Sequence, residues 1–209
     1  MLFYYGLILY FRKMNFLAHI YLSGDDDLLT IGNFAADSIE GNKYKHLPKQ
    51  MQDGILLHRQ IDTFTDSHPI VKQSKKRLHE NYGHYSGVIV DILYDHFLAK
   101  NWKQYSDVPL PEYVDVFYDM LSANFEILPI GTQKLLPFMV ADNWLLSYAS
   151  ISGITKVLEG VNKRTKNRSK MNLAVAELQE FYDEFEQEFT LFFDDLIQFT
   201  QNYIADKID

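Results

Sequence analysis

The sequence predicts an all-α protein, a single-domain bundle of seven or eight helices. Two observations lead to this fold class: strand-like alternation of apolar and polar residues is scarce, and apolar residues recur at helical spacing in most segments. The chain has 209 residues, of which 47% are hydrophobic, and this is enough to build one substantial core. Because no linker, low-complexity tract or internal repeat divides the sequence, we expect residues 14–209 to form one domain.

Capping and turn residues indicate where the helices begin and end. Ser23 and the aspartates at 25–27 favour a helix start, since their side chains accept hydrogen bonds from free amides, and Gly41 predicts the end of that helix. Ser67 is the expected cap of a helix that has Pro69 in its first turn. The helices are therefore expected over residues 23–41, 48–67, 67–83, 86–102, 109–128, 133–150, 151–163 and 178–203.

The last of these segments shows the clearest helical pattern. Its apolar residues step by three or four positions and form a single stripe along the whole segment. An aromatic stripe of this kind favours core packing over a cofactor site. The stripe consists of Leu178, Phe181, Phe185, Phe189, Phe192, Leu196, Phe199 and Tyr203.

Composition limits the partners and the metal chemistry. The chain has no cysteine, so it has neither disulfides nor thiolate ligands, and a metal would have to be bound by His, Asp or Glu. The absence of cysteine is also compatible with a cytoplasmic location. The net charge of −8 argues against nucleic acid as a partner.

The first residues contain an apolar run at 2–11. This run is shorter than the roughly 20 residues that span a bilayer, so no stable membrane insertion is expected. Arg12 and Lys13 follow the run, whereas a signal peptide has its basic residues in front. Met14 offers a second start, and residues 1–13 are therefore expected to be an upstream extension of the reading frame. A short membrane-touching anchor is the alternative.

The stretch GILLHRQIDTFTDSHP, residues 54–69, is the first candidate for a functional site. His58, Asp62 and Asp66 are spaced four residues apart and lie on one face of the expected helix. Such a stripe is either a solvated face, in which Asp62 pairs with Arg59, or half of a metal site.

The stretch VIVDILYDHFLAKNW is the second candidate, because its helix is apolar on nearly all sides and is expected to be buried. Burying Asp91 and Asp95 costs several kcal/mol unless they are paired, hydrogen-bonded or metal-bound, and their like charges repel. A divalent cation would remove both difficulties, although His96 could also be a core histidine with satisfied hydrogen bonds.

Two further polar residues in apolar surroundings, Asp37 and His19, strengthen the interpretation as a metal site. A carboxylate-rich site with one or two imidazoles suits Mg²⁺ or Mn²⁺, whereas calcium would require more oxygen ligands. The residues therefore predict a metal centre between helices.

Four blocks in this order resemble the acyl-carrier-protein phosphodiesterases, a divergent branch of the HD-domain phosphohydrolases: MNFLAHIYLS, GNFAADSIEGN, GILLHRQIDTFTDSHP and DILYDHFLAKNW. The resemblance runs from Met14 to about Trp102. It implies a helical hydrolase dependent on Mn²⁺ or Mg²⁺ that cleaves the phosphodiester between 4′-phosphopantetheine and a serine of holo-acyl carrier protein. The ligands it implies are Asp37, His58, Asp62, Asp95 and His96, with Asp91 and His19 as further candidates.

The chemistry of metal-assisted phosphodiester hydrolysis suggests further roles in catalysis. Asp66 or Asp91 could orient or deprotonate the attacking water. Arg59 could bind the phosphate oxygens with its guanidinium group, or it could form an ordinary surface ion pair.

Two basic runs, at 72–77 and 162–170, stand out in an acidic chain. Charge runs are usually solvated faces, but an acidic carrier protein would need local positive potential to dock. The second run is the better candidate for docking, through Lys163, Arg164, Lys166, Arg168 and Lys170.

Two other functions fit the same residues. One is an HD-type hydrolase of a nucleotide or another small phosphoester, and the other is a non-enzymatic helical binding protein in which the Asp and His residues are structural.

Overall fold

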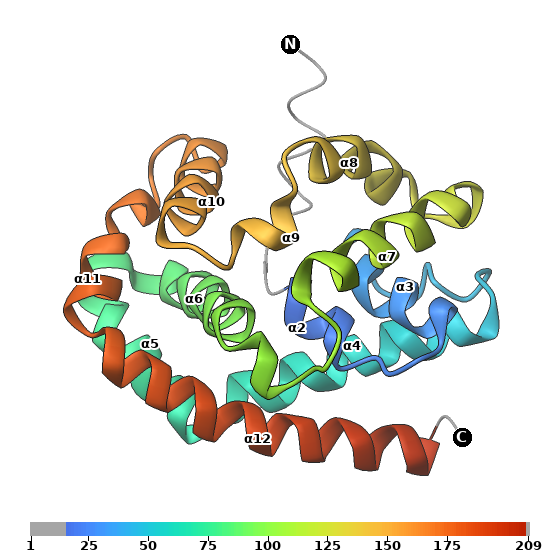
Figure 1. Cartoon of the computed structure of the whole chain (residues 1–209), viewed down its shortest axis with the longest axis horizontal. Helices are drawn as coiled ribbons and strands as arrows, with labels where there is room; N and C mark the ends of the chain where they lie inside the picture. Colours follow the sequence, from blue (N-terminus) through green and yellow to red (C-terminus); the bar gives the residue numbers. More distant parts are fainter. Residues whose placement is uncertain (1–15, 208–209) are drawn as a thin grey trace.

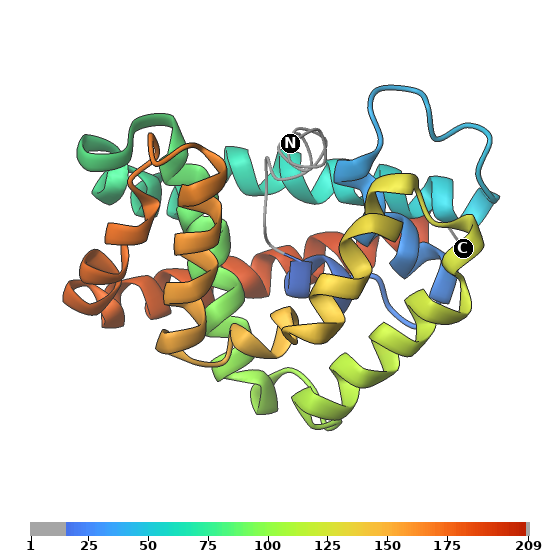
Figure 2. The same ribbon diagram turned by 90° about the horizontal axis from the view of Figure 1, so that it is seen from above.

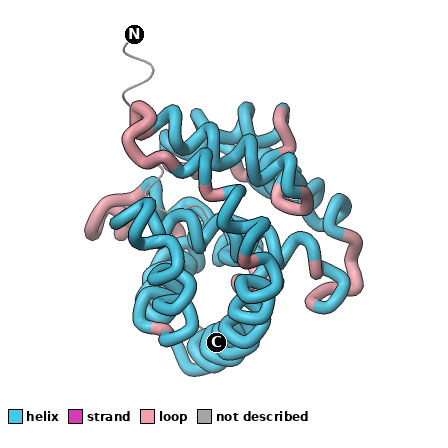
Figure 3. Tube along the Cα trace, turned by 90° about the vertical axis from the view of Figure 1, so that its left-hand side faces the viewer, coloured by secondary structure: helices cyan, strands magenta, loops and turns pink. Residues whose placement is uncertain are grey.

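The computed structural model describes residues 16–207, and these are helices joined by loops (Figures 1 and 3). Over this range the chain contains no strand and has eight helices of seven or more residues, which confirms the predicted all-α class. The expectation for residues 1–13 lies outside the described residues. The helices are α2 (Phe16–Tyr21), α3 (Asp27–Ala35), α4 (Lys49–Ser67), α5 (Pro69–Tyr82), α6 (Ser86–Lys100), α7 (Leu110–Ala123), α8 (Ile130–Ala141), α9 (Trp144–Ser147), α10 (Ile151–Arg164), α11 (Val175–Glu180) and α12 (Tyr182–Lys207).

The capping predictions are partly confirmed. Asp26 caps α3 by accepting a hydrogen bond from the Leu29 amide at 2.7 Å. The helix ends at Ala35, well before Gly41, because the chain tightens there into the 3₁₀ turn η2 (Ala36–Ser38). The predicted helix end at Gly41 is therefore wrong.

The helix that begins at Pro69 is confirmed, and it ends at Gly83, whose φ of 54° favours glycine. Ser67 is not its cap, because the Ser67 hydroxyl donates to the Phe64 carbonyl inside α4 and His68 occupies the cap position.

Two segments predicted as single helices are divided. Asn143, with a φ of 42°, separates α8 from α9, and its side chain then caps α9. Phe181, with φ −114° and ψ 34°, separates α11 from α12. In both places one residue leaves the helical region, so the apolar periodicity continues across a break in the backbone.

Helix α12 runs along one side of the molecule and packs against α4, α5 and α6, while α7 to α10 cover the opposite side (Figure 1). In the view from above, α10 lies across α6 at one end and α3 and α4 lie toward the other (Figure 2). Phe185, Phe189 and Phe192 of the predicted stripe are buried, and Phe199 and Tyr203 are partly buried against the core, which confirms core packing of the stripe.

Helices α3 and α4 lie unusually close together because each contributes a glycine that faces the backbone of the other helix. A Cβ atom at Gly32 would overlap the Met51 carbonyl group, and one at Gly54 would overlap the Leu29 carbonyl oxygen. This close approach brings the backbone of α3 within hydrogen-bond distance of the α4 side chains. None of the described helices is long and apolar enough to cross a membrane.

Candidate metal centre

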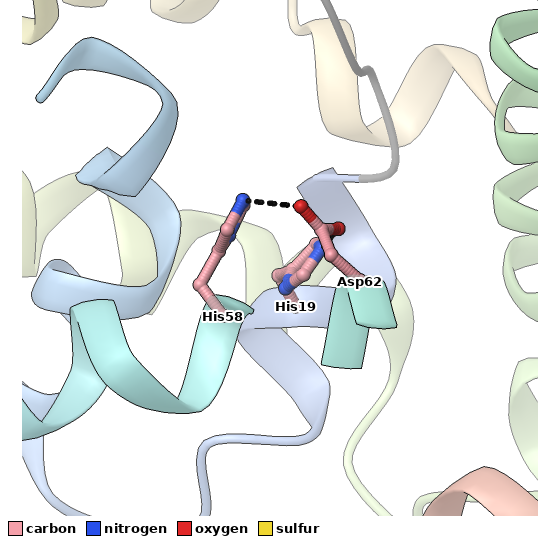
Figure 4. Close-up of side chains that lie close together, drawn as sticks. All are labelled: His19, His58 and Asp62. Carbon is pink, nitrogen blue, oxygen red and sulfur yellow. Dashed lines mark ion pairs between the residues drawn. The ribbon is translucent and has the colours of Figure 1, made fainter. Parts of the chain in front are cut away.

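Three side chains from two helices meet in one place (Figure 4). His19 comes from α2, and His58 and Asp62 come from successive turns of α4. The Nε2 atom of His58 lies 3.4 Å from Oδ2 of Asp62, and the Nε2 atom of His19 lies 3.6 Å from Oδ1 of the same carboxylate. One carboxylate therefore faces both imidazoles.

The other ring nitrogen of each histidine is held by α3. Nδ1 of His19 lies 2.8 Å from the side-chain oxygen of Asn33, and Nδ1 of His58 lies 2.9 Å from the backbone oxygen of Asn33. The two rings stack with centroids 4.0 Å apart and planes 20° apart. Because both Nδ1 atoms point to α3, both Nε2 atoms point to Asp62.

The spacing of the group is one that could hold a metal ion. One ligand atom from each of His19, His58 and Asp62 lies within 4.8 Å of the others, and no other group of this kind occurs among residues 16–207. The Nε2 atom of His19 is buried and makes no hydrogen bond to any described residue. A buried polar atom without a hydrogen-bond partner is costly, and a cation at this point would satisfy it. Asp62 remains 20% exposed, so the group can be reached from solvent.

The pKa values reflect strong coupling in this group. Burial lowers the pKa of His58, but the hydrogen bonds and charges of Asp37 and Asp62 outweigh burial and raise it to about 9. Burial raises the pKa of Asp62, but the two histidines outweigh burial and hold it well below its usual range. Burial and the neighbouring His58 lower the pKa of His19. Near neutral pH the metal-free group thus pairs a charged His58 with an ionised Asp62.

Asp37 lies at the edge of this group, on η2. One of its carboxylate oxygens is 3.3 Å from Nε2 of His58, and its side chain is 22% exposed. The next residue, Ser38, is hydrogen-bonded to Thr132 of α8 at 3.2 Å. Arg59 donates to the Gly41 carbonyl at 2.6 Å and thereby holds the loop that follows Asp37.

Asp95 and His96, which were expected as ligands, are engaged elsewhere. The carboxylate of Asp95 is fully buried and accepts hydrogen bonds from the amides of Leu17 and Ala18, at 3.0 and 2.9 Å. Burial raises the pKa of Asp95 well above its usual value, and these two amides offset part of that effect. Asp95 thus holds the first turn of α2 instead of joining the metal-binding group.

Both ring nitrogens of His96 are hydrogen-bonded. Nδ1 lies 2.7 Å from the Tyr148 carbonyl, which can only accept, and Nε2 lies 2.8 Å from the Tyr182 hydroxyl. Burial lowers the pKa of His96, so a neutral ring donates through Nδ1 and accepts through Nε2. The lone pair that a metal would need is already hydrogen-bonded, which supports the core-histidine alternative.

The two carboxylates considered as water-orienting groups are not members of the metal-binding group either. Asp66 lies one turn beyond Asp62 on α4, is 56% exposed and pairs with Lys75 at 2.7 Å. Asp91 is buried on α6.

The basic run at 162–170 consists of the last residues of α10, which ends at Arg164, and of the loop that follows, and this loop has a defined shape. The Ser169 hydroxyl donates to the Asn162 side chain at 3.0 Å, and Lys166, Asn167 and Lys170 have positive φ values of 55°, 59° and 56°. Arg164 is half-buried over the ring of Trp144, at 5.5 Å, and burial lowers its pKa. The other four basic side chains are exposed: Lys163, Lys166, Arg168 and Lys170.

Asn33 is the residue in this centre that the sequence did not single out. It lies in the block GNFAADSIEGN, between Gly32 and Phe34, and is fully buried. A signal was present, because a polar amide in an apolar helix and next to a glycine is unusual, but local spacing could not show that it contacts both histidines.

Comparison with known proteins shows the family of the chain. Residues 14–196 match the family model described as acyl carrier protein phosphodiesterase. The chain belongs to this family. Among curated members, the acyl carrier protein phosphodiesterase of Photorhabdus laumondii is 30% identical over 190 residues, 90% of this chain and 96% of the relative. That of Enterobacter sp. strain 638 is 32% identical over 181 residues, 86% of this chain and 94% of the relative. No solved structure matches the chain. The family match covers α2 to most of α12, so it includes every residue of the candidate centre.

Proposed function

We propose that this protein is a metal-dependent phosphodiesterase that removes 4′-phosphopantetheine from holo-acyl carrier protein. Membership of the acyl carrier protein phosphodiesterase family supports the reaction class and the substrate. The observation that carries the metal dependence is the group of His19, His58 and Asp62, in which a buried imidazole nitrogen lacks a hydrogen-bond partner among residues 16–207. A cytoplasmic location is part of this proposal, and a chain without cysteine is compatible with that reducing compartment.

The proposed ligands are His19, His58 and Asp62, with Asp37 as the adjacent carboxylate. Two imidazoles and one or two carboxylates suit Mn²⁺ or Mg²⁺. When bound, such an ion neutralises phosphate oxygens and lowers the pKa of a water molecule.

In the proposed reaction, water adds to phosphorus and the bond between phosphorus and the serine oxygen of the carrier breaks. The serine oxygen takes a proton, so the products are apo-acyl carrier protein and 4′-phosphopantetheine. Asp37 is the carboxylate best placed to accept a proton from the attacking water, because it is partly exposed and lies beside His58. Arg59 fixes the loop behind Asp37 through its bond to the Gly41 carbonyl.

The loop 162–170 is the proposed docking surface for the acidic carrier. Four of its basic side chains are exposed, and hydrogen bonds within the loop fix its shape. The run at 72–77 is a weaker candidate, because Arg77 forms an ion pair with Glu188 at 2.8 Å and Lys75 pairs with Asp66.

The experiment that tests this function is incubation of the purified protein with holo-acyl carrier protein and Mn²⁺, followed by mass spectrometry of the carrier. The expected result is a loss of mass equal to 4′-phosphopantetheine that requires Mn²⁺ and stops when a chelator is added. Hydrolysis of nucleotide phosphodiesters but not of the carrier would favour the HD-type alternative. Failure to cleave any phosphodiester would favour a helical binding protein.

The docking surface has its own test. Replacing Lys163, Lys166 and Arg168 by Gln should raise KM for the carrier roughly three- to tenfold and flatten the salt dependence of kcat/KM, with kcat nearly unchanged. A matched control replaces Lys103, Lys134 and Lys207, which are exposed and lie outside both basic runs, and should leave KM unchanged. Equal losses on the carrier and on a small phosphodiester would mean that the loop is structural or catalytic.

A further inference from the structure

The hydrogen bonds around Asn33 determine which atom carries the proton on each histidine of the metal-binding group. Backbone carbonyl oxygens can only accept hydrogen bonds. They therefore fix the orientation of the Asn33 amide, and with it the protonated nitrogen of His19 and of His58.

The Asn33 side chain has a single consistent orientation. Its nitrogen lies 2.9 Å from the backbone oxygen of His19 and 2.9 Å from the Ser23 hydroxyl, while the hydroxyl itself lies 2.8 Å from the same His19 oxygen. The His19 oxygen accepts from both groups. The Ser23 hydroxyl therefore donates its hydrogen to the backbone oxygen of His19, and the hydroxyl oxygen accepts a hydrogen bond from the side-chain nitrogen of Asn33. The opposite end of the Asn33 amide, facing the His19 ring, must be the carbonyl oxygen.

This orientation fixes the His19 ring. The Asn33 side-chain oxygen can only accept, so Nδ1 of His19, 2.8 Å away, carries the hydrogen. In the neutral ring the lone pair is then on Nε2, the buried atom that has no hydrogen-bond partner among the described residues. The backbone oxygen of Asn33 acts in the same way on Nδ1 of His58, at 2.9 Å.

We propose that Asn33 is a positioning residue that holds both metal-binding histidines with Nδ1 protonated and Nε2 directed at Asp62. The inference rests on the metal centre of the proposed function. Outer hydrogen bonds of this kind orient imidazole ligands in metal sites. Two different groups of Asn33 are involved: its side-chain oxygen accepts a hydrogen bond from His19, and its backbone oxygen accepts one from His58.

The backbone contact depends on the close approach of α3 and α4. Gly32 and Gly54 have no room for a Cβ atom, and the Asn33 carbonyl lies at this narrow contact. A side-chain substitution at Asn33 therefore removes the bond to His19 and keeps the bond to His58. The His58 ring serves as an internal control in the same sample.

The test begins with the metal-free wild-type protein. Nitrogen-15 NMR of the imidazole rings reports which nitrogen carries hydrogen, and the His19→Gln and His58→Gln variants assign the two signals. His19 should be a single tautomer with hydrogen on Nδ1. Hydrogen on Nε2 of His19 in the wild type would overturn the proposal, whether or not any variant folds.

Two variants then separate positioning from simple stabilisation. Asn33→Leu should give His19 a mixture of tautomers and weaken Mn²⁺ binding roughly 10- to 100-fold, while Nδ1 of His58 keeps its hydrogen. Ser23→Ala removes a hydrogen bond of the same network without touching either ring, and it should lower thermal stability but leave the His19 tautomer and Mn²⁺ affinity unchanged.

Unchanged His19 tautomer and Mn²⁺ affinity in a folded Asn33→Leu protein would overturn the proposal. Wild-type protein that binds no Mn²⁺ would instead overturn the metal centre, and the tautomer of the metal-free His19 would still report on Asn33.

Discussion

Helices α4 and α6 each carry a buried histidine and an aspartate, yet the polar atoms of the two pairs differ in their hydrogen bonds. On α4, His58 and Asp62 face His19 from α2, and the Nε2 atom of His19 has no hydrogen-bond partner among the described residues. On α6, both oxygens of Asp95 accept backbone amides, and both nitrogens of His96 are hydrogen-bonded. The difference teaches that an Asp and His pair on a helix is not by itself evidence of a metal site. A buried ring nitrogen without a hydrogen-bond partner is the feature that indicates a bound ion.

The largest effect that would separate the two regions is expected at Asp62. Asp62→Ala should lower kcat/KM on holo-acyl carrier protein by at least roughly a thousandfold, because it removes the one carboxylate that faces both histidines. Helix content, measured by circular dichroism, should be unchanged. Asp66→Ala, one turn further along α4, is the matched control and should remain near wild type. A large loss at Asp66 would restore the sequence-based expectation that it orients water.

The second effect is a pH dependence of metal binding. The raised pKa of His58, about 9 in the metal-free protein, means that Nε2 carries a proton near neutral pH, which a metal ion must displace. Raising the pH toward 9 removes this competition. Mn²⁺ affinity should therefore rise up to about tenfold per pH unit from about pH 6.5 to about pH 8.5. Calorimetry in buffers of different ionisation enthalpy would measure the proton released, and binding without proton release would contradict the assignment of His58.

A third effect concerns the α6 region itself. Asp95→Asn keeps the shape of the side chain but sets an NH₂ group against a backbone amide, so we expect a loss of about 2 kcal/mol, roughly 4–8 °C in Tm. Below the unfolding transition the variant should still bind Mn²⁺ with wild-type stoichiometry. A variant with unchanged Tm and no Mn²⁺ binding would instead make Asp95 a ligand.

The smallest effect is expected from removing residues 1–13. A protein that begins at Met14 retains the whole family match and all the residues of both regions, so Tm and kcat/KM should be unchanged within error. Insolubility or the absence of a thermal transition would show that the apolar run at 2–11 contributes to the fold.

Local signals were sufficient to predict much of the fold. The apolar periodicity and the proline and glycine positions give α4 and α5 nearly to the residue, because helix starts and stops depend on neighbouring residues. They fail at Asn143 and Phe181, where one residue leaves the helical region although the apolar pattern continues.

The site was only partly predictable for a similar reason. His58 and Asp62 are four residues apart on one helix, so the sequence alone predicts that their side chains lie on the same face. The meeting of α2, α3 and α4 depends on tertiary packing at Gly32 and Gly54, so the roles of His19 and Asn33 could not be read from spacing. The first turn of α2 lies far from Asp95 in sequence, which is why that carboxylate looked like a metal ligand.

The most direct test is to titrate wild-type protein, Asp62→Asn and His96→Gln with Mn²⁺ and to measure the bound ion by electron paramagnetic resonance. The first variant changes the α4 group and the second changes the α6 pair, and both replace one side chain by a close neutral analogue. We expect saturable binding of Mn²⁺ to the wild type and to His96→Gln, and loss of that binding in Asp62→Asn. Binding retained in Asp62→Asn and lost in a folded His96→Gln protein would contradict this expectation.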